Sequence, residues 1–182
     1  MKCLFTLYSK NVTIHLHQPI DNIESGAECI FIQISPRLGI KLFYNNKLAA
    51  QRSAYRQNKA SKYLLGPRVL SPIHKYTMII KKNNLTYLNK RDIISEGSIF
   101  GKDSWYCNYP RNNKFIFYGY KTQIAKMYNS KLKKTEGKIR SLRLALNSIV
   151  FKRDGFGDLV AGNNCGWIGK NLVAVDFGDF SV

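Results

Sequence analysis

The sequence predicts an α+β fold in two parts, and three observations support this prediction. Short runs rich in β-branched and aromatic residues, CIFIQI, GIKLFY, YTMII and KFIFYGY, are typical of strands and lie in the first two thirds of the chain. One helical pattern interrupts these strands at 46–67, and a more amphipathic one follows at 134–153. Near its end the chain has GWI and LVAVDF around the turn GKN, an arrangement typical of a β-hairpin.

The first two strands and the helix after them are delimited by turn residues. Pro36 lies between CIFIQI and GIKLFY, and Gly66 followed by Pro67 is expected to end the helix. The large side chains of this helix lie on a related face: Leu48, Tyr55 and Tyr63. The strands YTMII and KFIFYGY are separated by about 81–113, a connection too long for an ordinary hairpin loop, which predicts a functional insertion.

The second helix and the hairpin form the other part of the chain. The apolar residues of this helix make one stripe: Ile139, Leu142, Leu146, Ile149 and Val150. Its lysines and arginines lie off that stripe, so the helix is expected to pack on one side only. We therefore divide the chain into 1–120, a sheet with one helix and the insertion, and 121–182, a basic helix, an acidic loop and the hairpin.

Composition limits the class of protein. The 182 residues are 45% apolar, enough to bury a core. No apolar run approaches the roughly 20 residues that span a bilayer, and MKCLFTLYSK becomes polar too early for a secretory signal, so we expect a cytoplasmic protein without a membrane partner. The four cysteines form no CxxC pair, which favours reduced thiols. His15 and His17 share a strand face but have no third ligand nearby, which favours solvated residues over a metal site.

The net charge of +18 predicts an anionic partner, which could be nucleic acid, an acidic protein or a polyphosphate ligand. The charge is unevenly distributed. No Asp or Glu occurs from Cys29 through Arg91, whereas several aspartates follow residue 150. Carboxylates gathered in one region of so basic a chain suggest a chemical role there.

Two of these aspartates and an asparagine between them have a spacing that can be compared with known motifs. Asp158 lies five residues before Asn163 on the loop after the second helix, and Asp176 begins the triplet Asp-Phe-Gly thirteen residues after Asn163. In this order the residues resemble the protein-kinase-like fold, whose catalytic loop is H-R-D-x-x-x-x-N and whose metal-binding triplet is D-F-G. The loop here reads FGDLVAGN and the triplet is intact.

The resemblance implies a role for each residue. Asp158 would be the catalytic base, and Asn163 and Asp176 would hold Mg²⁺ on the phosphates of ATP. In the first half, SGAECIF resembles a reduced glycine-rich phosphate loop with Gly26 as its middle glycine. GIKLF resembles the strand whose lysine pairs with the phosphates, which makes Lys41 that lysine.

The sequence also departs from the family pattern. The glutamate that would pair with the strand lysine is matched by Gln57, so Lys41 is expected to rely on Asp176, on Gln57 as a neutral acceptor, or on the nucleotide. Phe156 and Gly157 stand where His and Arg are usual, so we expect no activation by loop phosphorylation. Only four residues follow the triplet, which resembles minimal kinase-like proteins of bacteriophages and would place the protein in a host cytoplasm.

Two functions follow from this resemblance. The first is an ATP- and Mg²⁺-binding phosphotransferase acting on itself or on a protein partner. The second is a catalytically weak pseudokinase that serves as a basic binding module for a host protein or, less favoured, a nucleic acid. Two alternatives to the assigned roles remain open: capped turns for Asp158, Asn163 and Asp176, and a solvated position on the strand for Lys41.

Overall fold

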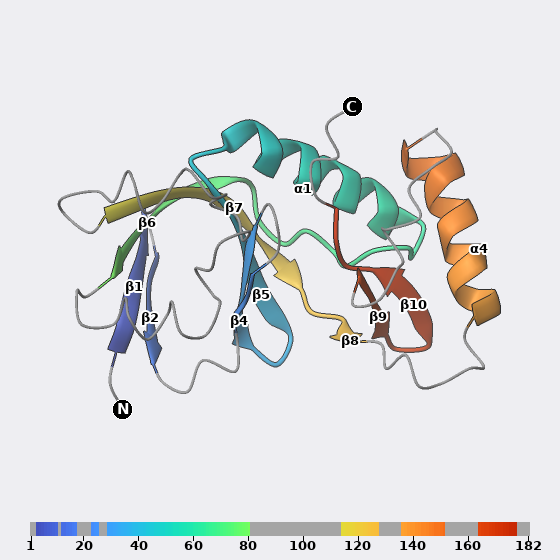
Figure 1. The fold of residues 1–182 in the computed structure, drawn as a ribbon, viewed down its shortest axis with the longest axis horizontal. Helices are drawn as coiled ribbons and strands as arrows, with labels where there is room; N and C mark the ends of the chain where they lie inside the picture. The colour runs from blue at the N-terminus through green and yellow to red at the C-terminus, as the bar shows by residue number, and fades with distance from the viewer. Residues whose placement is uncertain are drawn as a thin grey trace.

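The computed structural model describes residues 3–10, 12–17, 23–25, 29–80, 114–127, 136–151 and 164–177. The fold is α+β: a curled seven-stranded antiparallel sheet is covered by helix α1, and a three-stranded sheet packs with helix α4 (Figure 1). The elements are β1 Cys3–Ser9, β2 Val12–His17, β3 Ile23–Ser25, β4 Ile30–Ser35, β5 Leu38–Tyr44, α1 Lys47–Lys62, β6 His74–Ile80, β7 Lys114–Gln123, β8 Lys126–Met127, α4 Glu136–Leu146, a π-helical turn Asn147–Phe151, β9 Cys165–Ile168 and β10 Asn171–Ala174.

The large sheet has the strand order β2-β1-β6-β7-β5-β4-β3. All four strands predicted for this part are present, as β4, β5, β6 and β7. Strand β7 lies between β5 and β6, and Gly119 of β7 pairs with Leu42 of β5. A Cβ atom at Gly119 would collide with the main-chain carbonyl of Lys41, so glycine is what allows these two strands to approach closely.

The sheet is extended by an N-terminal hairpin of which the sequence indicated only one strand. Strand β1 pairs with both β2 and β6, so the hairpin continues the sheet beyond β6. His15 on β2 is exposed and its ring contacts the Thr6 hydroxyl on β1, consistent with a solvated strand residue. Among the described residues no three His, Cys, Asp or Glu side chains gather as a metal site.

Helix α1 packs against the sheet through small side chains. It begins at Asn46, whose Oδ1 accepts a hydrogen bond from the Ala49 amide at 2.9 Å. The buried residues of the helix are Ala49, Ala50, Ser53, Gln57 and Ala60. Leu48, Tyr55 and Tyr63 share a face as predicted, but that face points to solvent, with 54%, 69% and 56% of each residue exposed. Small residues face the sheet because the backbone of α1 lies close to the large rings of Phe43 and Tyr120.

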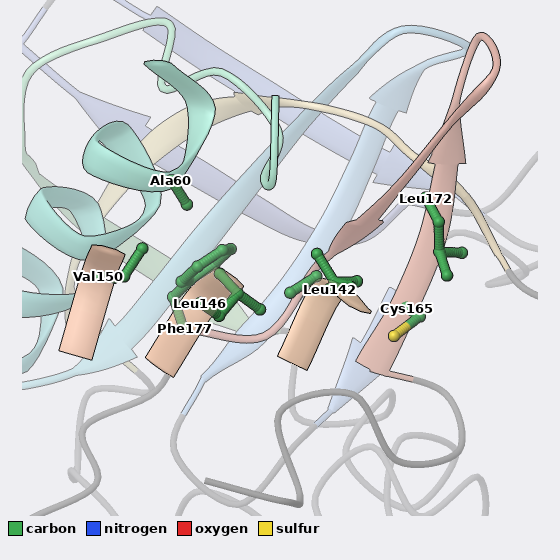
Figure 2. Packing of buried hydrophobic residues seen from close by; sticks show 8 residues of the cluster. Ala60, Leu142, Leu146, Val150, Cys165, Leu172 and Phe177 are labelled. Atoms are coloured by element: carbon green, nitrogen blue, oxygen red, sulfur yellow. The ribbon is translucent and has the colours of Figure 1, made fainter. Parts of the chain in front are cut away.

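The second part has its own core. The predicted apolar stripe is confirmed and runs along α4 and the π-helical turn after it: Leu142, Leu146 and Val150 are buried, and Ile139 and Ile149 are partly buried against them. The hairpin β9–β10 is also present, and its turn needs Gly169, whose φ is +60°. Phe177 lies in this core with Ala60 of α1, so the cluster joins both parts of the fold (Figure 2).

Candidate functional site

Two of the five predicted site residues fall in the described part of the chain. Lys41 lies on β5, and Asp176 follows β10. Gly26, Asp158 and Asn163 lie outside the described residues, as does the predicted insertion at 81–113. The site is therefore built from Lys41 and the segment around Asp176.

Lys41 is buried in spite of its charge, with only 6% of its surface exposed. Strand β5 is paired on both edges, with β4 and β7, and residues 39–43 are all buried. The Lys41 ammonium donates a 2.6 Å hydrogen bond to the main-chain carbonyl of Val175. It also lies 5.9 Å from the centre of the Phe177 ring. Lys41 is thus not a solvated strand residue, and it meets a segment 134 positions away in the sequence.

The segment that meets Lys41 is anchored on both sides of Asp176. The Val175 amide donates to the Asn164 carbonyl at 2.9 Å, and the preceding Ala174 amide donates to the Leu65 carbonyl at 2.9 Å. On the other side, the Phe177 ring is fully buried. It fills the space beside Gly66, where a Cβ atom would come within 2.8 Å of the ring. Asp176, partly exposed, therefore stands between two immobilised neighbours.

Gln57 does not serve Lys41 as an acceptor, contrary to one of the sequence-based expectations. Its amide oxygen accepts a 3.0 Å hydrogen bond from the Tyr120 hydroxyl, and its amide nitrogen donates to the Thr122 hydroxyl and, at 3.1 Å, to the Pro67 carbonyl. The Tyr120 hydroxyl also lies 2.9 Å from that of Ser53. The reason is positional: Gln57 contacts the strand β7, whereas Lys41 belongs to β5.

This buried polar network was not found by sequence reasoning. Burial raises the pKa of Tyr120 well above its usual value, and the negative charges of Cys29 and Asp176 raise it further, against a lowering hydrogen bond from Ser53. The sequence offered one indication, namely Ser53 and Gln57 four residues apart on a helical face otherwise made of alanines.

The two described site residues differ in the ligands they suit. A buried ammonium is costly unless an anion or several acceptors compensate it, so Lys41 suits a phosphate. The Asp176 carboxylate is a hard oxygen ligand of the kind that Mg²⁺ prefers. The described part of the site thus contains one buried ammonium group and one partly exposed carboxylate.

Neither of the helices described by the structure is both long and apolar enough to cross a membrane. Comparison with known proteins provides no relative from which a role could be taken: no family model, no curated protein and no solved structure matches this chain.

Proposed function

We propose that the chain is a kinase-like protein that binds ATP with Mg²⁺, with Lys41 and the segment Val175–Phe177 on one wall of the nucleotide site. The observation that carries this proposal is the hydrogen bond between Lys41 and Val175, directly beside Asp176. It brings a strand lysine to the first two residues of the D-F-G triplet, from the far end of the sequence, as phosphate binding through lysine and metal would require.

The order of elements around Lys41 supports the same proposal. The lysine strand β5 is followed by helix α1, and the resemblance implies a helix directly after the strand that carries the phosphate-pairing lysine. The hydrogen bond from Lys41 goes to a neutral carbonyl, and an ammonium has three donor protons. Donors therefore remain for the phosphate oxygens of a nucleotide.

The bound Mg²⁺ would neutralise phosphate charge. In the proposed site Lys41 positions the phosphates, and Asp176 and Asn163 hold the metal. Gly26 lets the backbone approach the nucleotide, and Asp158 accepts the proton of the acceptor hydroxyl. The acceptor belongs to the chain itself or to a protein partner in the cytoplasm.

Thermal unfolding with ATP, with and without Mg²⁺, tests this proposal. Ligand at a hundred times its dissociation constant adds about 2.7 kcal/mol, which raises the unfolding midpoint by roughly 5 to 10 °C in a chain of this size. We expect a magnesium-dependent rise in the wild type that is lost in Asp176→Asn and Lys41→Met. Lys75→Met removes an exposed lysine from β6 and should keep the rise.

Absence of a rise in the wild type, or a rise that survives in both site variants, would contradict the site. Asp158→Asn separates binding from chemistry: it should keep the magnesium-dependent rise and lose phosphate transfer. Full transfer activity in this variant would remove Asp158 from the proposed mechanism.

A second candidate is the pseudokinase, a binding module with weak or no turnover. The neutral side chain of Gln57 and its place in a closed network with Tyr120 and Thr122 favour it, because no carboxylate of α1 can orient Lys41. Magnesium-dependent nucleotide binding without phosphate transfer to the chain or to a partner would select this candidate.

A further inference from the structure

The outer face of α1 carries a stripe of basic and large apolar side chains. At 100° per residue, six side chains fall within an arc of about 100°: Leu48, Arg52, Tyr55, Lys59, Lys62 and Tyr63. The buried residues of the helix lie on the opposite side, and Figure 1 shows α1 with one side on the sheet and the other turned outward. From Leu48 to Tyr63 the stripe runs about 22 Å. We call these six residues the α1 stripe.

The charge of the α1 stripe has one sign. Neither α1 nor any residue between Cys29 and Arg91 is acidic, so no carboxylate from this part of the sequence lies among the basic residues. Three of the six residues of the stripe are positive. These three charges are part of the net charge of +18, and their field favours a polyanion lying along the helix.

The aromatic residues narrow the choice of polyanion. Tyr55 lies three residues after Arg52 and four residues before Lys59, and Tyr63 lies four residues after Lys59, so each ring has a cationic neighbour on the same face. Both tyrosines are mostly exposed, although large rings on a helix normally pack inward. Bases stack on exposed rings while Arg and Lys contact the phosphates, and this combination is typical of proteins that bind single strands.

We propose that the α1 stripe binds single-stranded nucleic acid, through base stacking on Tyr55 and Tyr63 and phosphate contacts to Arg52, Lys59 and Lys62. An acidic protein segment would match the charges, but it would make no use of the ring faces. The proposal does not depend on the nucleotide site, because the stripe and Lys41 belong to different elements and the buried side of α1 lies between them.

The test measures binding of a fluorescein-labelled single strand of twenty thymidines by anisotropy at several salt concentrations. One variant, Arg52→Gln/Lys59→Gln/Lys62→Gln, removes three charges from the stripe. Its matched control, Lys75→Gln/Lys126→Gln/Lys170→Gln, removes three charges from exposed positions on β6, β8 and the β9–β10 turn. We expect the stripe variant to lose at least tenfold more affinity than the control. Its slope of log K against log salt should become shallower by about 2, because each lost phosphate contact accounts for about 0.7.

Tyr55→Ala/Tyr63→Ala tests stacking separately from charge. We expect it to lose roughly tenfold or more in affinity for the labelled strand, with the salt slope unchanged. All variants change exposed or partly exposed side chains, so circular dichroism and the thermal midpoint should remain as in the wild type. The magnesium-dependent response to ATP should also remain, which separates failure of this proposal from failure of the nucleotide site.

Three results would overturn the proposal. Equal losses in the two charge variants would mean that binding reflects only the overall charge of the molecule. If the wild type does not bind the labelled strand at low salt, single-stranded nucleic acid is excluded as the ligand of the α1 stripe. Competition by polyglutamate as strong as by unlabelled strand, with no effect of the tyrosine substitutions, would assign the stripe to an acidic protein.

Discussion

The Tyr120 hydroxyl shows how single polar groups organise the interior of this protein. It is fully buried, donates to Gln57 and lies within hydrogen-bond distance of Ser53. A buried donor or acceptor that loses its partner costs about 1–3 kcal/mol, so each member of the network stabilises the position of α1 on β7. The network is neutral, which lets it remain buried without the desolvation cost of a charge.

Stability at alkaline pH should report on Tyr120. Its pKa is raised in the folded state, so above the ordinary tyrosine pKa of about 10 the unfolded chain loses a proton that the folded chain keeps. The free energy of unfolding should therefore fall as pH rises above about 10, by up to about 1.4 kcal/mol per pH unit from this residue. Tyr120→Phe should be less stable at pH 7 but lose less stability between pH 9 and 11.

Urea unfolding at a series of pH values measures this effect. Ser53→Ala is the control, because it removes one partner of Tyr120 and retains the ionisable hydroxyl. It should lower stability at pH 7 and keep the alkaline decline. If the free energy of unfolding falls equally with pH in the wild type and in Tyr120→Phe, the decline at alkaline pH does not come from Tyr120.

At the level of elements, the contact between β5 and β7 determines where Lys41 lies. Lys41 pairs with Tyr120 and Leu42 pairs with Gly119, so the lysine strand and the network strand are adjacent. The strands can approach because Gly119 has no side chain to meet the Lys41 carbonyl. This close approach explains why a glycine lies in the middle of strand β7.

Gly119→Ala should therefore destabilise the protein by about 1–3 kcal/mol, because the added methyl group forces β5 and β7 apart. Gly137→Ala is a matched substitution in α4, where nothing lies within 4 Å of the added methyl group. It should instead stabilise the protein by about 0.5–1 kcal/mol. Denaturant unfolding compares the two variants, and a neutral Gly119→Ala would show that the close approach is not required.

At the level of the whole molecule, Phe177 joins the two parts. Its ring packs in one cluster with Ala60 from α1, with Leu146 and Val150 from the second helix and its π-helical turn, and with Leu172 from the hairpin (Figure 2). The same segment carries Val175, whose carbonyl accepts the hydrogen bond from Lys41. The packing of Phe177 in the core and the hydrogen bond between Lys41 and Val175 therefore depend on each other. The two parts should therefore unfold as one cooperative unit.

Phe177→Ala should lower the free energy of unfolding by about 3–5 kcal/mol, through the lost ring and the cavity left in the shared cluster. Leu144→Ala, on the exposed side of α4, should change it by less than about 0.5 kcal/mol. Urea unfolding followed by tryptophan fluorescence and by circular dichroism measures both variants. Separate transitions from the two probes in the wild type, or a loss below about 1 kcal/mol in Phe177→Ala, would contradict a shared core.

The sequence by itself determined the local elements. Alternating and β-branched runs predicted β4 through β7. The stripe of Leu142, Leu146 and Val150 predicted the buried face of α4 and its π-helical turn, and the turn with Gly169 predicted the last hairpin. These features depend on the period of side chains along a helix or strand, and a single chain carries that information without its neighbours. For the same reason the pattern correctly grouped Leu48, Tyr55 and Tyr63 on one face.

Only the tertiary structure decided which faces are buried and which distant residues meet. A helix with small residues on one side and large ones on the other can pack either way, and the depth available above Phe43 and Tyr120 placed the small side inward. The sequence allows Lys41 to be a solvated strand residue or a site residue, and contact with the distant segment Val175–Phe177 made it a buried one. The partner of Gln57 likewise depended on which strand lay beneath α1. These outcomes depend on close packing between segments far apart in the chain, and side-chain periodicity carries no information about it.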